Sequence, residues 1–413
     1  MKRLATVWVL MLMVFGFTSC EDKNNDMVLT EPKTIELVPG SDIIISGSNR
    51  FGIELFTRVA LTENQNFTLS PLSASVALTM LLNGAGGETL SQMQSALGYP
   101  AQADRATINR AYKSLAGQLL NADPSVVLGL ANAMFYRQDF QVKQNFVHTL
   151  QMDFDATVRG LDFRQQAAID AINRWASEST KGKIPTVVES ISDETMLFLM
   201  NALFFQGNWT HSFNRAATAN RSFFVNPQTP IQVPTMKGRF SVRSFSNEML
   251  HAVELPYGRG NFSMVVVLPM QRDIRSLLNT FTPERWMQIT SALDAQQASP
   301  TIDVYLPRFQ FAYRKTLNSQ LKAMGMTHAF DSNRANLTGI SDIRDLFVHS
   351  VRQDTHITVN EEGTTAAAVT TVEVGITSVG PLPFVANKPF LFFIRERTTN
   401  TLLFAGQVLN PLE

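Results

Sequence analysis

One stretch of the sequence, residues 363–387, fits neither a core strand nor an ordinary surface loop. It contains a single charged residue, Glu373. Its first part, residues 364–372, holds only Thr, Ala and Val, so it has too little apolar bulk to anchor itself in a core. It could instead slide between two existing strands, because alternate side chains of an extended chain share one face. The small residues that would then point inward are Thr364, Ala366, Ala368 and Thr370. The composition is also typical of a flexible surface loop.

The N-terminus has the pattern of an export signal. Lys2 and Arg3 precede an uncharged apolar run, residues 4–17, which is too short for a comfortable membrane span. The run ends in small residues before Cys20 and resembles the signal of bacterial lipoproteins. That resemblance implies removal of residues 1–19, lipidation of Cys20 and anchoring of an exported protein to the bacterial cell envelope. The alternative is an ordinary secretory signal with a chance cysteine.

The remaining chain divides into a tether and one domain. Residues 20–46 are rich in polar and turn-forming residues, which predicts a tether between membrane and fold. No break rich in Gly, Ser and Pro interrupts residues 47–413, and 45% of the chain is apolar, so we expect one domain with a large core.

Composition excludes several kinds of chemistry. The 35 basic and 35 acidic residues cancel, which argues against a nucleic-acid partner held by bulk charge. Cys20 is the only cysteine, so its acylation would leave no thiol for disulfides, nucleophilic catalysis or metal binding. The six histidines lack zinc-ligand spacing and no GxSxG motif occurs. We therefore expect no metal, no cofactor and no recognisable hydrolase motif, and a lipid-anchored hydrolase stays open as a further hypothesis.

Local patterns predict a mixed fold. Ser70 and Pro71 have the cap and first-turn residues of a helix that ends near Asn83, and a further helix ends at Gly325. A helical face also follows Ser48. Strand-like runs occupy residues 262–268, 301–306 and 401–408. Helices dominate early and strands later, which favours an α+β fold with mainly antiparallel sheets.

Several motifs, in order along the chain, resemble the serpin family. The strongest are NFTLSPLS (66–73), NALFFQGNW (201–209), VNEEGTTAAA (359–368) and NKPFLFFI (387–394). Weaker matches lie at residues 180–184, 233–236, 255–257, 403–406 and 410–411. The resemblance covers residues 48–413 and implies the serpin fold: a large central sheet, two further sheets, surrounding helices and an exposed reactive-centre loop at about residues 361–383.

The resemblance also assigns roles to residues. It implies a hinge at Glu361, Glu362, Gly363, Thr364, Thr365, Ala366, Ala367 and Ala368; a shutter at Asn66, Ser70, Pro71, Ser73, Asn201 and Gln353; and a breach residue, Trp209. One departure concerns Gln353, which stands where many serpins carry a histidine. Its amide can bridge strands by hydrogen bonds but cannot titrate near neutral pH.

The resemblance further implies a monomeric inhibitor that acts as a suicide substrate. A peptidase cuts the loop and forms an acyl-enzyme, and the loop then enters the central sheet before water completes the reaction. The small hinge residues favour insertion, since a buried charge there would cost several kcal/mol. We therefore expect Thr364→Arg to leave folding intact and to prevent inhibition. A non-inhibitory serpin that acts as a binding or chaperone module is the alternative.

The scissile bond is predicted to be Thr377-Ser378. Counting back from the motif at residue 387 gives Ser378-Val379 instead, and Ile376-Thr377 is a further alternative. All candidates are uncharged, and a trypsin-like pocket requires a cation. The expected targets are elastase-like or subtilisin-like serine peptidases, with papain-like cysteine peptidases as an open alternative.

Overall fold

The computed structural model describes residues 32–270, 273–343, 346–364 and 382–413. Contacts divide the chain into two units, Met1–Thr30 and Glu31–Glu413, and all described elements lie in the second. Its helices are α1 (Ser41–Ala60), α2 (Pro71–Leu82), α3 (Gly87–Ala96), α4 (Arg105–Leu120), α5 (Gln144–Phe154), α6 (Gln166–Ser179), α7 (Ile274–Leu278), α8 (Pro283–Asp294) and α9 (Asn318–Ala323), with 3-10 turns η1 (Arg215–Ala217) and η2 (His328–Phe330). Within the described parts of the chain, no helix is both long and apolar enough to cross a membrane.

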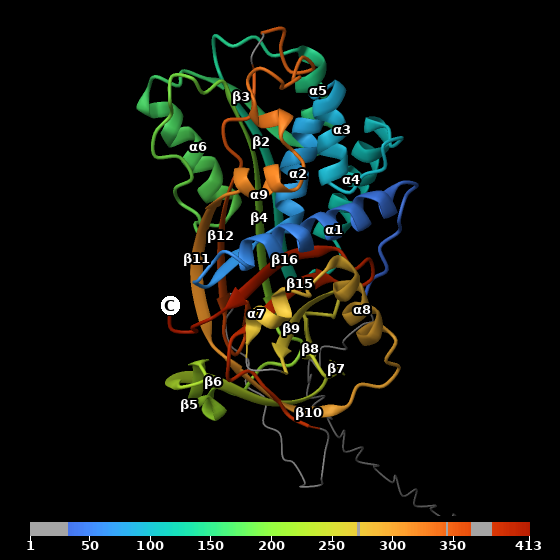
Figure 1. The fold of residues 1–413 in the computed structure, drawn as a ribbon, viewed down its shortest axis with the longest axis vertical. Coiled ribbons are helices and arrows are strands. Elements are labelled where there is room, and N and C mark those ends of the chain that lie inside the picture. Colours follow the sequence, from blue (N-terminus) through green and yellow to red (C-terminus); the bar gives the residue numbers. More distant parts are fainter. Residues whose placement is uncertain (1–31, 271–272, 344–345, 365–381) are drawn as a thin grey trace, which may run out of the picture. The chain divides into compact units, whose positions relative to one another are not determined.

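The largest strands form a central sheet in the order β11-β12-β13-β4-β2-β3. Its members are β11 (Phe309–Thr316), β12 (Arg352–Val359), β13 (Gly363–Thr364), β4 (Leu197–Asn208), β2 (Val126–Arg137) and β3 (Ala156–Leu161). All neighbours are antiparallel except β2 and β3. In Figure 1 these strands run lengthwise through the unit, and α6 packs against β2 and β4.

A second sheet, here called the core sheet, has the order β1-β16-β15-β9-β8-β7. Its strands are β1 (Phe67–Leu69), β16 (Leu402–Val408), β15 (Phe390–Glu396), β9 (Phe262–Pro269), β8 (Leu250–Tyr257) and β7 (Arg243–Ser246). Every residue of β9, β15 and β16 is buried, which explains their nearly continuous apolar sequences.

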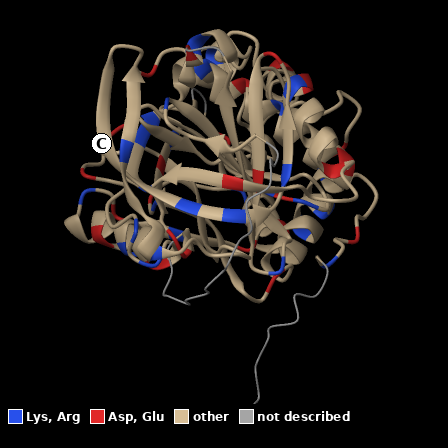
Figure 2. Cartoon of the chain, turned by 90° about the horizontal axis from the view of Figure 1, so that it is seen from below, with Lys and Arg blue, Asp and Glu red and all other residues tan. Residues whose placement is uncertain are grey.

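A third sheet, here called the end sheet, has the order β14-β10-β6-β5. Its strands are β14 (Phe384–Val385), β10 (Thr301–Pro307), β6 (Thr229–Ser241) and β5 (Ala219–Asn226). It lies at the lower end of the unit in Figure 1 and faces the viewer in Figure 2. The mixed, mainly antiparallel architecture confirms the predicted α+β class.

The local signals for α2 and α9 are confirmed. The Ser70 side chain accepts a hydrogen bond from the backbone of Ser73 and Pro71 is the first residue of α2. Beyond α9, Gly325 takes the left-handed conformation (φ 93°) that ends the helix. The capped α2 is buried along almost its whole length and packs against α1, β4 and β16, so it joins the central and core sheets.

The folded unit begins earlier than residue 47, where the sequence predicted it. Helix α1 begins at Ser41, and Ile44 and Ile45 are buried within it. Even before the helix, the Asn261 side chain binds both backbone groups of Lys33. The turn residues 39–41 therefore start a helix in place of a linker, and the folded unit extends before the predicted tether boundary at residue 46.

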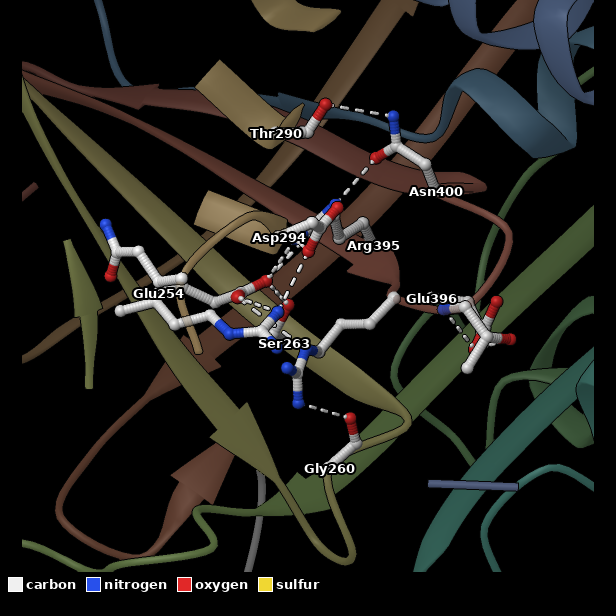
Figure 3. A network of polar contacts seen from close by, with 12 residues as sticks. Glu254, Gly260, Ser263, Thr290, Asp294, Arg395, Glu396 and Asn400 are labelled. Carbon is white, nitrogen blue, oxygen red and sulfur yellow. Dashed lines mark hydrogen bonds and ion pairs between the residues drawn. The ribbon is translucent and has the colours of Figure 1, made fainter. Parts of the chain in front are cut away.

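A buried arginine joins the core sheet to α8 (Figure 3). Arg395 of β15 is 0% exposed, and its guanidinium donates to the Glu254 carboxylate of β8 at 2.7 and 2.9 Å. It also donates to both carboxylate oxygens of Asp294 at 2.7 and 2.9 Å and to Asn400 at 3.1 Å. A charge removed from water requires such multiple partners, so this network holds the helix, two strands and the following turn in one arrangement.

We predict that Arg395→Met destabilises the protein by about 3–5 kcal/mol, because Glu254 would keep its charge without this partner while only 2% exposed. The measurement is the midpoint of thermal unfolding at one fixed scan rate. Arg159→Met, which removes an exposed guanidinium, is the control. Adding Glu254→Gln to Arg395→Met should recover part of the loss. Equal midpoints for Arg395→Met and Arg159→Met would contradict the prediction.

Candidate functional site

The chain reverses direction between β12 and β13 in a tight hairpin. The Asn360 side-chain oxygen accepts hydrogen bonds from the backbone of Glu362 (3.1 Å) and Gly363 (3.2 Å). Gly363 has φ 148°, and an added Cβ would lie 2.1 Å from the Gly207 carbonyl oxygen. Only glycine fits this position, so the turn fixes where β13 enters the central sheet.

The two hinge glutamates are buried and paired. The Glu361 side chain is 3% exposed and accepts from Arg308 Nε at 2.7 Å and from the Thr218 hydroxyl. Glu362, 4% exposed, pairs with Arg215. These contacts tie the hairpin to η1 and to the segment between β10 and β11.

The Glu361 carboxyl is held in its charged form. Burial by itself raises the pKa of Glu361, but hydrogen bonds from Arg308 and Thr218 outweigh burial and lower it below its ordinary value of 4.5. A lowered folded-state pKa means that the carboxylate stabilises the fold above the unfolded-state pKa. That contribution is lost as the pH falls through the folded-state value.

The first residue after the turn is already inside the sheet. Thr364 is 4% exposed, and its hydroxyl shares a hydrogen bond of 2.8 Å with the Tyr257 hydroxyl. The Tyr257 ring stacks on Trp209 with 4.4 Å between centroids, and Trp209 Nε1 donates to the Asn360 carbonyl at 2.9 Å. Burial raises the pKa of Tyr257 far above its ordinary value, so the phenol stays neutral and keeps its proton.

Strand β13 separates β12 from β4 at one end only. Its residue Thr364 pairs with Val359 of β12 and with Gly207 of β4. Among the described residues, β12 and β4 are not neighbours in the sheet, and a groove that is partly open to solvent lies between them. The groove is lined by Leu203, Phe204 and Phe205 of β4, His356 and Thr358 of β12, Thr364, Phe404, and Thr180, Lys183 and Ile184 after α6.

Further along the groove, Gln353 joins β12 to the start of α2. Its amide oxygen accepts from the Ser70 backbone nitrogen at 3.0 Å, and its amide nitrogen donates to the Ser70 carbonyl at 2.7 Å. On the other side of the groove, the Ser73 hydroxyl donates to the Asn201 carbonyl of β4 at 3.3 Å. The N-terminus of α2 therefore binds both strands that flank the opening.

Known proteins resemble this chain in sequence and in fold. A family model described as serpin (serine protease inhibitor) matches residues 46–411.

The chain belongs to the serpin family.

Individual serpins resemble it over nearly their whole length. The leukocyte elastase inhibitor of Sus scrofa is 33% identical over 89% of this chain and 99% of its own. Among solved structures, the thermophilic serpin tengpin in its native state has a TM-score of 0.81 at 26% identity and covers 92% of this chain and 97% of its own. Human thyroxine-binding globulin also has a TM-score of 0.81, at 25% identity, with 90% and 100% covered. These likenesses confirm the predicted serpin fold.

The structure brings most of the predicted shutter together. Ser70, Pro71, Ser73, Asn201 and Gln353 all lie around the N-terminus of α2. Asn66 lies apart from them and binds the backbone of residues 409 and 410 at the end of β16. Sequence reasoning missed Asn132, whose side-chain oxygen accepts from the Asn201 side chain at 2.6 Å.

Sequence analysis also missed the residues that bind the hinge glutamates. Nothing local in the sequence marks Arg308, Arg215 or Thr218, since their partners lie far away along the chain. The burial of Thr364 changes one expectation, because an arginine there would already strain the uncut protein. We therefore no longer expect Thr364→Arg to leave folding intact.

Several predicted residues lie outside the described part of the chain: Thr365, Ala366, Ala367 and Ala368 of the hinge, the candidate scissile residues Ile376, Thr377, Ser378 and Val379, and the lipidation site Cys20. In the part that is described, no three His, Cys, Asp or Glu side chains gather as a metal ion would require.

We predict that Glu361→Gln lowers the stability of the uncut protein at pH 7 by about 2 kcal/mol, because the charge-assisted bonds to Arg308 weaken. The thermal midpoint of the variant should begin to approach that of the wild type as the pH falls below the ordinary value of 4.5, and should meet it only below the lower folded-state pKa, where the buried carboxylate becomes protonated.

The exposed Glu248→Gln serves as the matched control and should change little at either pH. A difference between Glu361→Gln and wild type that stays constant from pH 7 to pH 3.5 would refute the role given to the carboxylate.

Proposed function

We propose that this serpin inhibits serine endopeptidases as a suicide substrate whose cut loop enters the central sheet between β12 and β4. The observation that carries the proposal is the two-residue strand β13, which sits at the end of the groove and pairs with both flanking strands. Family membership and the printed name of the porcine relative, an elastase inhibitor, support peptidase inhibition at the coarser level.

The register of β13 indicates the path of insertion. Continued beyond Thr364, it would set Ala366 between Phe205 and Ile357, and Ala368 between Leu203 and Thr355. Thr370 would then lie between Asn201 and Gln353, beside the N-terminus of α2.

The orientation of Thr364 decides which side chains enter the interior. Because the Thr364 side chain is buried against Tyr257, residues 366, 368 and 370 would point the same way in an extended strand. These residues are Ala, Ala and Thr, which a packed interior can accept, whereas residues 365 and 367 would face outward. An inserted strand would also give hydrogen-bond partners to the facing edges of β12 and β4.

Trapping requires a covalent link that forms before insertion. The peptidase serine adds to the carbonyl of the scissile bond, for example at Thr377, and an ester forms as the amide bond breaks. The leaving nitrogen, here that of Ser378, takes up a proton and departs as an amine. Insertion then carries the esterified peptidase away before water hydrolyses the ester.

Target class follows from the uncharged residues around the scissile bond. Residues 376–379 are Ile, Thr, Ser and Val, which suit a shallow apolar pocket and lack the cation of a trypsin substrate. We propose elastase-like or subtilisin-like peptidases as targets, with papain-like cysteine peptidases as a second class that would form a thioester.

A binding serpin is the second candidate function, because the fold also matches thyroxine-binding globulin. Cleavage of the loop by every peptidase tested, without any covalent complex on a denaturing gel, would favour it over the inhibitor.

We also propose that the protein is exported and anchored by lipid on Cys20, which the apolar run before this cysteine supports. Cys20→Ser should move the protein from the membrane fraction to the soluble fraction of a Gram-negative host and abolish labelling by a radioactive fatty acid. Unchanged labelling of the variant would contradict lipidation at this residue.

We predict that Ala368→Arg converts the inhibitor into a substrate, because its guanidinium would have to enter the interior with the inserted strand. The number of inhibitor molecules consumed per peptidase should rise at least about tenfold, the fold-change expected from a cost above 1.4 kcal/mol. Active-site titration of subtilisin and pancreatic elastase, with denaturing gels, gives this number.

Ala367→Arg is the matched control, since its side chain would face solvent after insertion. It should consume nearly the wild-type number of molecules per peptidase. Equal behaviour of the two variants would contradict insertion in the register of β13.

A further inference from the structure

The end sheet carries a group of basic side chains without acidic partners. We call Arg221, Lys237 and Arg239, together with Tyr305, the basic patch. Arg221 is exposed and the other three residues are half-buried. Within the described residues, no carboxylate oxygen lies within 4.0 Å of these three cations.

An aromatic ring organises the patch. The Arg221 guanidinium lies 4.7 Å from the centroid of the Tyr305 ring, and Lys237 Nζ lies 5.6 Å from it. The strand register pairs Lys237 with Tyr305 and Arg239 with Asp303, and paired residues lie on the same face of a sheet. The side chains of both pairs therefore share one face of β6 and β10. Asp303 offsets part of the charge, and the patch keeps a positive excess in a chain whose net charge is zero.

The patch lies next to the end of the reactive loop. Strand β14, which follows the loop, pairs Val385 with Tyr305. Leu382, just before β14, is 80% exposed, and Phe224 of β5, 38% exposed, donates its backbone nitrogen to the Asn387 carbonyl at 2.8 Å. Figure 2, which looks onto this end, shows blue segments with few red ones on the strands that cross its middle.

We propose that the basic patch is a docking surface for the target peptidase, and that it fits an acidic area beside the peptidase's active site. This inference rests on the proposed function, because a peptidase bound to the loop must approach this end of the unit. Unpaired cations near a binding site speed encounter with an acidic partner and change affinity less than rate. Exposed Leu382, just before the strand that pairs with Tyr305, and the patch's own Arg and Tyr give the composition typical of protein–protein contacts.

A peptidase fits the patch better than a polyanion does. Release of counterions from a nucleic acid or an acidic polysaccharide requires many cations in a row, and here two lie over one ring and the third, Arg239, lies beside Asp303.

The test compares three proteins in the rate of complex formation with subtilisin. They are the wild type, Lys237→Glu/Arg239→Glu, and the control Arg159→Glu/Arg58→Glu, which alters net charge equally at exposed residues of β3 and α1. Each is also measured with succinylated subtilisin, whose lysines carry added carboxylates, at concentrations set by active-site titration.

Succinylation should speed association with the wild type and the control at low salt but not with the patch variant. The patch variant should associate with succinylated subtilisin about tenfold more slowly than wild type at low ionic strength, and within about twofold of it at 0.5 M salt. The number of inhibitor molecules consumed per peptidase should stay the same in all three.

Three results would overturn the proposal. Equal rates for the patch variant and the control would show that only net charge matters. Binding of dextran sulfate at 150 mM salt that is lost in the patch variant, with unchanged association rates, would make the patch a polyanion site. Absence of a covalent complex in all three proteins would reject the proposed function itself, and the patch with it.

Discussion

The opening between β12 and β4 depends on how firmly the hairpin at residues 360–363 is held. Gly363 lets the chain pass within contact of β4, Asn360 closes the turn, and the buried Glu361 carboxylate ties it to Arg308. These contacts place Thr364 inside the sheet while the register between β12 and β4 beyond it remains unfilled among the described residues. Under the proposed mechanism, an uncut chain remains in this state because further insertion requires a freed loop end.

The rest of the unit provides a frame in which that opening can exist. The core sheet is buried throughout β9, β15 and β16 and is locked to α8 by Arg395. Helix α2 connects this frame to both sides of the opening through Ser70 and Ser73. Gln353 makes its two bonds to Ser70 with a neutral amide, so the contact between β12 and α2 does not change with pH near neutrality. The fold tolerates the missing strand pairing between β12 and β4 because the core sheet and α2 are closely packed.

The sequence predicted the structural features that depend on residues adjacent to one another in the chain. The cap at Ser70, the helix end at Gly325 and the strands β9, β10 and β16 follow from local patterns, and the family motifs led to the hinge and shutter. The start of α1 at Ser41 was not predicted from the sequence. Pro39, Gly40 and Ser41 are turn-forming residues, and such residues occur both in a tether and at the start of a helix. Arg308, Arg215 and Arg395 were missed because each pairs with a carboxylate brought close only by the fold. Thr364 was expected to become buried only after cleavage, and the structure buries it beforehand.

Under the proposed mechanism, the uncut protein holds a higher-energy arrangement and relaxes when the loop is cut. The most direct measurement compares the thermal midpoint of the intact protein with that of protein nicked between residues 376 and 379, the cut being located by mass spectrometry of the released C-terminal fragment. Insertion of a new strand with hydrogen bonds on both edges predicts a rise of at least about 10 °C. An unchanged or lower midpoint after a complete cut would contradict the central claim.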